Sequence, residues 1–127
     1  MEKLYIEGSA KTPSVSFDGD SGVLEMRGRS IPENSIEFFQ PLIDWVDAYG
    51  ATPNPKTRVD MKLEYFNTSS SKCILDLFKR LERINKEDSQ VLINWYYETD
   101  DEDMEEAGED YAAIVGLEFE ILEIDEI

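Results

Sequence analysis

The sequence contains no histidine and only one cysteine, Cys73. Without histidine the chain can form neither a Ser-His-Asp or Cys-His nucleophile pair nor a histidine-ligated zinc site. A single cysteine also excludes an internal disulfide and a metal site built from cysteine alone. The groups left for chemistry are carboxylates, hydroxyls, amines and one thiol, so several common enzyme classes are excluded from the start.

Positive charge is scarce, because 12 Lys and Arg residues stand against 29 Asp and Glu residues and leave a net charge of −17. Such a polyanion repels phosphate backbones and anionic lipid surfaces, which argues against binding nucleic acid or a membrane surface. No stretch approaches the roughly 20 apolar residues of a transmembrane helix, and the N-terminus lacks the apolar run of a signal peptide. We therefore expect no membrane insertion and a cytoplasmic location.

The length of 127 residues, 41% of them hydrophobic, suits one packed core, so we expect a single domain over residues 1–127. Short alternating strands are predicted near residues 4–7 and 15–17 and over 23–28, with a turn at 18–22. A helix should follow, because Asn34 can cap it with Glu37 three residues on. Its apolar stripe is Ile36, Phe39, Leu42, Ile43 and Val46. Pro41 should kink or interrupt this helix.

The second half predicts two further strand–helix alternations. Val59, Met61, Leu63 and Tyr65 alternate with polar residues and should face a core. The next helix has the stripe Ile74, Leu77, Phe78, Leu81 and Ile84, with outer pairs Asp76–Arg80 and Glu82–Lys86. Residues 91–97 are apolar enough for a strand inside the sheet. An acidic helix over 100–114, with Met104, Ala107, Tyr111 and Ile114 inward, and a strand from Leu117 to Ile124 complete the chain.

This order of elements predicts an α/β domain with a mixed β-sheet and helices packed mainly on one face. Strand–helix–strand crossovers require at least some parallel pairing.

Four consecutive hydroxyl residues, Thr68, Ser69, Ser70 and Ser71, follow Asn67 where a predicted strand meets a helix. One reading is capping, in which Ser69, Ser70 or Ser71 bonds a free helical amide and contributes about 1 kcal/mol. One hydroxyl suffices for that role. The other reading is a phosphoacceptor, because such a corner presents hydroxyls to a kinase beside the positive end of the helix.

Other groups that could carry chemistry have simpler interpretations. The run Asp100–Asp103 cannot be a calcium loop, because a register with Gly108 at position 6 leaves Ala107 and Ile114 at ligand positions. Acids at a helix N-terminus are ordinary, since the helix dipole favours them. Cys73, beside Ile74, is expected to be a small buried hydrophobe rather than an activated thiol. We expect no catalytic residue, no metal and no cofactor.

The segments LEYFNTSSSKCILDL and VLINWYYETDDEDMEEAGEDY resemble the SiaC-type regulatory phosphoproteins of bacteria. The upstream segment TPSVSFDGDSGVLEMRGRSIPENSIEFFQPLIDWV is similar to the same family. The resemblance implies a fold like the STAS domains of anti-sigma-factor antagonists. It also implies that Thr68 is the phosphoacceptor, and that Asn67, Ser69, Ser70 and Ser71 form the corner around it.

The resemblance further implies a cognate serine/threonine kinase that phosphorylates Thr68 and a PP2C-type phosphatase that removes the phosphate. The unphosphorylated form would bind and regulate a diguanylate cyclase, linking the switch to cyclic-di-GMP signalling and biofilm control. Two alternatives remain open. One is an anti-sigma-factor antagonist in a partner-switching system, and the other is a small acidic metal-binding protein or enzyme.

Overall fold

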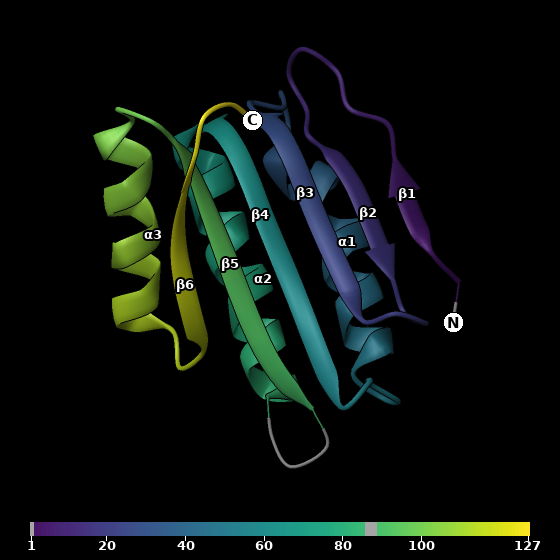
Figure 1. Ribbon diagram of the computed structural model, residues 1–127. Helices are drawn as coiled ribbons and strands as arrows, with labels where there is room; N and C mark the ends of the chain where they lie inside the picture. The colour runs from purple at the N-terminus through teal and green to yellow at the C-terminus, as the bar shows by residue number, and fades with distance from the viewer. Residues whose placement is uncertain (1, 86–88) are drawn as a thin grey trace.

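One six-stranded mixed sheet lies at the centre of the fold (Figure 1). The computed structural model describes residues 2–85 and 89–127. The strands are β1 (Leu4–Ile6), β2 (Ser14–Asp18), β3 (Val23–Ser30), β4 (Lys56–Phe66), β5 (Gln90–Glu98) and β6 (Glu118–Ile124). The helices are α1 (Ser35–Tyr49), α2 (Thr68–Ile84) and α3 (Glu102–Ile114). This order confirms the predicted α/β domain.

The strands lie in the sheet in the order in which they occur in the chain, from β1 to β6. β1, β2 and β3 pair antiparallel, whereas β3, β4, β5 and β6 pair parallel. The carboxyl ends of the parallel strands therefore meet at one edge of the sheet, and each of the three helices begins after one of these ends.

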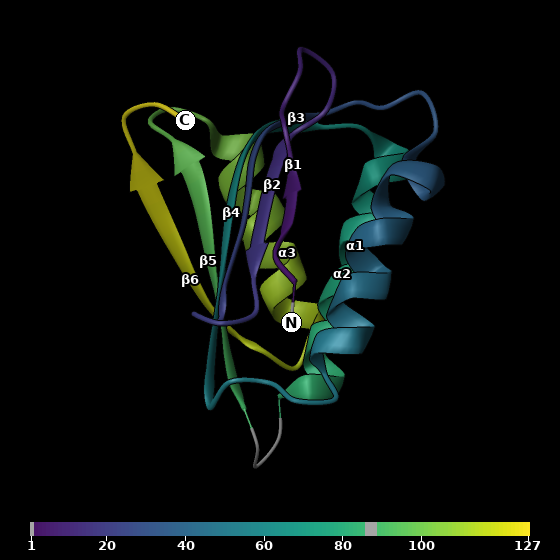
Figure 2. The same cartoon turned by 90° about the vertical axis from the view of Figure 1, so that its right-hand side faces the viewer.

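All three helices cover the same face of the sheet, as Figure 2 shows with the sheet seen along its edge. The core lies between this face and the helices. Its largest fully buried side chains are Trp95, Tyr49, Phe17, Phe39, Phe78, Leu24, Met26, Leu42, Met61, Leu63, Ile74 and Leu77. The predicted inward residues of β4 from Val59 to Leu63 and the whole predicted stripe of α2 are buried. No helix among residues 2–85 and 89–127 is long and apolar enough to cross a bilayer.

Pro41 does not interrupt α1, which runs without a break from Ser35 to Tyr49, so that half of the prediction is wrong. Proline removes the N–H that would bond the Glu37 carbonyl. Both residues are exposed, so water can hydrate that carbonyl. The predicted residues Phe39, Leu42, Ile43 and Val46 are buried, whereas Ile36 is 73% exposed. The other buried residues of the helix are Ser35, Trp45 and Tyr49.

A register shift between Gly28 and Arg29 changes which residues of β4 face the helices. Gly28, with φ of 121°, pairs with Leu63, and Arg29 pairs with Tyr65, so Glu64 is an extra residue on β4. One extra residue reverses the alternation of a strand. Tyr65 is therefore exposed, contrary to the prediction, and Phe66 packs against Trp95 and Tyr111 in its place.

The buried side of α3 differs in part from the predicted one. Met104 and Tyr111 are buried as expected, but Gly108 is buried as well, whereas Ile114 is 65% exposed. The reason is the Trp95 indole, whose Nε1–H donates to the Met104 carbonyl oxygen at 2.9 Å. Gly108 lets the helix backbone approach this ring.

Of the two predicted outer pairs on α2, Asp76–Arg80 is confirmed, with 3.5 Å between Oδ1 and Nε. Arg80 also pairs with Asp47 of α1. The pair Glu82–Lys86 involves a residue outside the described part of the chain. Glu82 accepts a hydrogen bond from the backbone N–H of Gly116 at 2.7 Å, which ties α2 to the segment after α3.

Candidate functional site

The corner where β4 ends and α2 begins, residues 67–71, brings together three segments of the chain. The Asn67 N–H donates to the carbonyl oxygen of Ser30, the last residue of β3, at 3.0 Å. Ser35, the first residue of α1, lies beside the same corner with its hydroxyl oxygen 2.7 Å from that of Ser69. The parallel pairing of β3 with β4 places these groups together at the carboxyl edge of the sheet.

Asn67, and none of the serines, caps α2. Its side-chain oxygen accepts the backbone N–H of Ser70 at 2.9 Å, and its backbone is extended, as an N-cap requires. The prediction that Ser69, Ser70 or Ser71 supplies the cap is therefore wrong. An asparagine side chain directly before the helix reaches the third amide, so the serine hydroxyls are left for other contacts.

Ser70 is fully buried and bonds only within the protein. Its hydroxyl donates to the Ser30 carbonyl oxygen at 3.1 Å and accepts from the Ser30 hydroxyl at 2.8 Å. Ser69 is more exposed, and its hydroxyl donates to the Asn67 side-chain oxygen at 3.2 Å. These two hydroxyls hold the corner together, and Ser70 is inaccessible to another protein.

Ser71 connects the corner to α3. The Tyr111 hydroxyl donates to the Ser71 carbonyl oxygen at 2.9 Å and lies 3.2 Å from the Ser71 hydroxyl oxygen. Burial raises the pKa of Tyr111, and the bond to Ser71 opposes this shift in part. The tyrosine therefore remains a neutral donor at physiological pH.

Thr68 differs from its neighbours. It is exposed, and its hydroxyl makes no hydrogen bond to any residue in 2–85 or 89–127. It is the first residue of α2, whose first turn contains no acidic side chain. The free helical amides and the helix dipole favour negative charge at this position. Of the four consecutive hydroxyls, this one is exposed and has no hydrogen-bond partner among the described residues, so a kinase can reach it without breaking a bond.

The other candidates from the sequence lie apart from this chemistry. Cys73 is half-buried against the core, and burial, with a further contribution from Asp76, raises its pKa. This is the opposite of an activated thiol.

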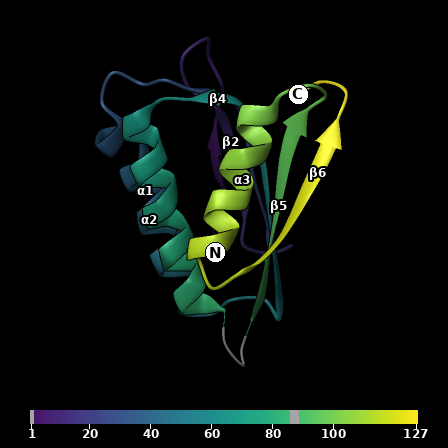
Figure 3. The same ribbon diagram turned by 90° about the vertical axis from the view of Figure 1, so that its left-hand side faces the viewer.

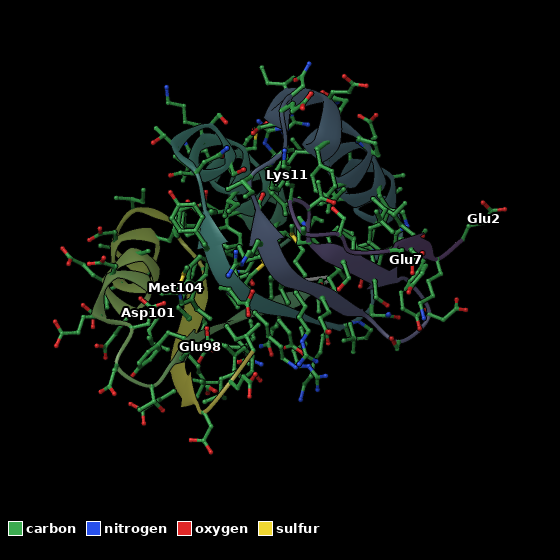
Figure 4. The ribbon with its side chains drawn as sticks, turned by 90° about the horizontal axis from the view of Figure 1, so that it is seen from above. Glu2, Glu7, Lys11, Glu98, Asp101 and Met104 are labelled. Carbon is green, nitrogen blue, oxygen red and sulfur yellow. The ribbon has the colours of Figure 1, made fainter. Side chains whose placement is uncertain are left out.

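The acidic run at residues 100–103 forms the start of α3. Asp101 caps the helix by accepting the Met104 N–H at 3.1 Å, and Glu102 and Asp103 lie in the first turn. Figure 4 views the molecule from above and labels Glu98 at the end of β5 with Asp101 and Met104 at the start of α3. Within the described ranges, no three acidic or thiol side chains are grouped so that they could hold a metal ion.

Sequence reasoning missed Ser30, Ser35 and Tyr111 as parts of the corner. Ser30 had an indirect signal, since it follows a predicted strand and at least some strands were expected to pair parallel. Nothing in the local sequence marks Ser35 or Tyr111 as neighbours of residues 67–71, because their contacts depend on helix packing across the sheet.

Comparison with known proteins identifies relatives over almost the whole chain. A model of the SiaC family, described as SiaC family regulatory phosphoprotein, matches residues 6–124. An uncharacterized protein of Pseudomonas aeruginosa (strain UCBPP-PA14) is 35% identical over 126 residues, which are 99% of this chain and 100% of that protein.

Solved structures of similar proteins share the fold. Apo-SiaC from Pseudomonas aeruginosa is 34% identical, with a TM-score of 0.87, and the match covers 96% of this chain and 99% of the other. A chain in the crystal structure of the diguanylate cyclase SiaD in complex with its activator SiaC, from the same species, is also 34% identical. Its TM-score is 0.88, and the match covers 95% of this chain and 99% of that chain.

Proposed function

Because this chain belongs to the SiaC family of regulatory phosphoproteins, we propose that it is a phosphorylation-switched activator of a diguanylate cyclase. In this proposal a serine/threonine kinase phosphorylates Thr68, a PP2C-type phosphatase reverses the reaction, and the unphosphorylated form binds the cyclase. The chain acts by binding and catalyses no reaction itself. The SiaC of Pseudomonas aeruginosa, described as the activator of SiaD, supports the choice of target.

The observation that carries the proposal is the difference between Thr68 and the hydroxyls that follow it. Ser70 is buried, Ser69 and Ser71 are hydrogen-bonded, and Thr68 is exposed with a free hydroxyl at a helix N-terminus. A kinase must reach the hydroxyl oxygen that it phosphorylates without breaking the hydrogen bonds that hold residues 67–71 together. Modification of the Thr68 hydroxyl breaks none of the side-chain hydrogen bonds that Asn67, Ser69, Ser70 and Ser71 make within the described residues.

The phosphate acts locally. It adds about −1.5 to −2 charges to a chain that already carries −17, so the overall field changes little. A partner that packs over the corner would have to desolvate a dianion, which costs several kcal/mol if the group stays unpaired, whereas the helix dipole returns only about 0.3–1 kcal/mol. Binding of the cyclase should therefore fall by about tenfold or more while the fold stays intact.

The test begins with the intact mass of the chain purified from its source bacterium. We expect a fraction that is heavier by one phosphoryl group. Thr68→Ala should abolish this fraction, and the matched control Ser69→Ala should keep it. Full phosphorylation of the Thr68→Ala protein would contradict the assignment.

The second measurement compares phosphorylated and unphosphorylated protein in binding to the diguanylate cyclase of the source bacterium and in its production of cyclic-di-GMP. Equal binding of the two forms would exclude the switch. Co-purification of partners with Thr68→Ala protein distinguishes a cyclase activator from the alternative function. An anti-sigma-factor antagonist would retain a kinase as its target and would leave cyclase activity unchanged.

A further inference from the structure

Lys72 lies one helical turn after Thr68 on α2. Its side chain is exposed, and it forms no ion pair with a carboxylate of residues 2–85 or 89–127. Residues four positions apart on a helix are neighbours on its surface, with about 5–6 Å between their Cβ atoms. The phosphoacceptor of the proposed switch and this lysine therefore share one face of α2.

The direction of the lysine side chain favours contact with a group on Thr68. Long side chains of a helix point back toward its N-terminus, so the Lys72 ammonium extends toward the first turn. An acid that precedes a base by four residues is the better of the two orders for an ion pair. A phosphate on Thr68 gives this order, and it also agrees with the helix dipole, which favours negative charge at the N-terminus.

Other cations are less suitable for a phosphate at residues 67–71, which we call the phosphorylation corner. Arg29 lies near the end of β3, but Glu64 engages its guanidinium, with 3.2 Å between Nε and Oε2. The next lysine of α2, Lys79, lies about 16 Å beyond Thr68 along the helix axis. Lys72 is therefore the best placed of the three cations.

Carboxylates are present on both helices that flank α2 at this corner. Glu37 lies in the first turn of α1, and Asp110 of α3 lines the same hollow as Lys72. Figure 3 shows α3 beside α2 on the helical face of the sheet. A phosphate on Thr68 carries about −1.5 to −2 charges, more than any single carboxylate, so it attracts the ammonium more strongly than Asp110 does.

We propose that Lys72 is a positioning residue of the phosphorylated state, in which its ammonium pairs with the phosphate on Thr68 and holds it over the first turn of α2. This inference rests on the proposed function, which supplies the phosphate, and adds the side chain that receives it. Without this lysine the phosphate would have only the helix amides as partners, on a chain whose net charge is already −17.

The test measures the second pKa of the phosphate by ³¹P NMR. Phosphothreonine is installed at position 68 during translation, so the result does not depend on whether a kinase accepts each variant. The ordinary value is about 6, and a cation beside the phosphate lowers it. Lys72→Met should therefore raise this pKa by about 0.2–0.5, the range that an ion pair between residues four apart on a helix gives. Lys72→Arg keeps the charge and should leave the pKa unchanged.

Lys79→Met is the matched control, because it removes the same charge from another exposed lysine of the same helix. Its distance exceeds the Debye length of about 8 Å at physiological ionic strength, so the pKa should change by less than about 0.1. Salt gives an independent readout. At about 1 M salt, where the Debye length is about 3 Å, the difference between Lys72→Met and the original chain should shrink by at least half. A difference caused by a disturbed helix would persist.

The outcomes separate this inference from the proposed function. Equal pKa values in the original chain and in Lys72→Met would overturn the role of Lys72, and an equal rise in Lys79→Met would overturn it as well, because charge would then act without a pair. In both cases the switch stands if the chain from its source bacterium carries phosphate on Thr68. If that chain carries none, the switch fails and the role of Lys72 fails with it. Both lysines are exposed, so equal melting temperatures will show that the variants fold.

Discussion

Tyr111 of α3 donates a hydrogen bond to the Ser71 carbonyl oxygen of α2 at 2.9 Å. This bond joins α3 to α2 and so links the acidic helix to the phosphorylation corner. Tyr111 also packs against Phe78 and Trp95, so the aromatic core holds its hydroxyl in place.

Removing this hydroxyl should cost stability without breaking the core. We expect Tyr111→Phe to lower the free energy of unfolding by about 0.5–1.5 kcal/mol, the net value of a typical internal hydrogen bond. Tyr5→Phe removes the same hydroxyl from an exposed ring and should be neutral. Urea denaturation of the two variants measures the difference, and equal midpoints would show that the Tyr111 bond contributes nothing.

Gly108 should not tolerate a side chain. Alanine normally stabilises a helix relative to glycine by about 1 kcal/mol. Here the added Cβ would lie only 2.8 Å from Cγ and Nε1 of the Trp95 indole. We therefore expect Gly108→Ala to destabilise the protein by about 1–3 kcal/mol through overpacking. Ala113→Gly, at an exposed position of the same helix, gives the ordinary propensity effect in the same denaturation experiment. A more stable Gly108→Ala protein would contradict this account of how α3 packs.

The Asn67 cap predicts a graded series. Asn67→Ala leaves the Ser70 amide without its partner and should lower the free energy of unfolding by about 1 kcal/mol. Asn67→Asp keeps an acceptor of the same shape and should retain most of the stability. Thermal denaturation distinguishes the two, and identical losses would mean that the side-chain oxygen is not the cap.

Cys73 should react slowly with iodoacetamide. Its raised pKa means that less thiolate is present at pH 8 than for a free cysteine, and the rate should rise with pH beyond the range where free cysteine is already ionised. Half-burial slows access further. Mass spectrometry of the native and the urea-unfolded chain gives both rates. A native rate above that of free cysteine would indicate an activated thiol.

Salt should weaken the association with the target. A chain of charge −17 attracts a basic partner surface. Salt screens this attraction, and at physiological ionic strength its range is already limited to a Debye length of about 8 Å. We expect the affinity to fall steadily as salt is raised from low concentration. An affinity independent of salt would show that apolar contacts alone hold the complex.

The architecture could be predicted because hydrophobic periodicity follows secondary structure. The alternation from Val59 to Leu63 and the stripe from Ile74 to Ile84 gave the correct strand, helix and buried face. The candidate corner was also visible, since one capping hydroxyl suffices and four consecutive hydroxyls follow Asn67 between a strand and a helix.

Two errors share one cause, which is that the hydrophobic periodicity of one segment carries no information about the elements that pack against it. The extra residue of β4, Glu64, depends on how β3 pairs with β4, and it decides that Phe66, not Tyr65, turns inward. The Trp95 ring draws Gly108 inward and leaves Ile114 outside. The buried side of a helix or strand is thus set partly by the element against which it packs.

The same limit applies within the corner. The sequence offered Ser69, Ser70 and Ser71 as caps, but the choice depends on which acceptor reaches the third amide, and Asn67 does. Which serine is buried depends on Ser30, which is 40 residues away along the chain from Ser70. Local reasoning therefore identified the group of residues and not their separate roles.

The agreement between strand order and chain order bears on how the protein forms during synthesis. Each strand from β2 to β6 pairs with the strand made immediately before it. A strand leaving the ribosome therefore always meets a finished edge, and no strand must wait for a distant partner or insert between two others. Each new pairing closes only the segment that joins two consecutive strands, so the contacts are as local as a parallel sheet allows. Growth of the sheet can thus follow translation from the first hairpin to the last strand, with α3 and β6 added to an already formed platform.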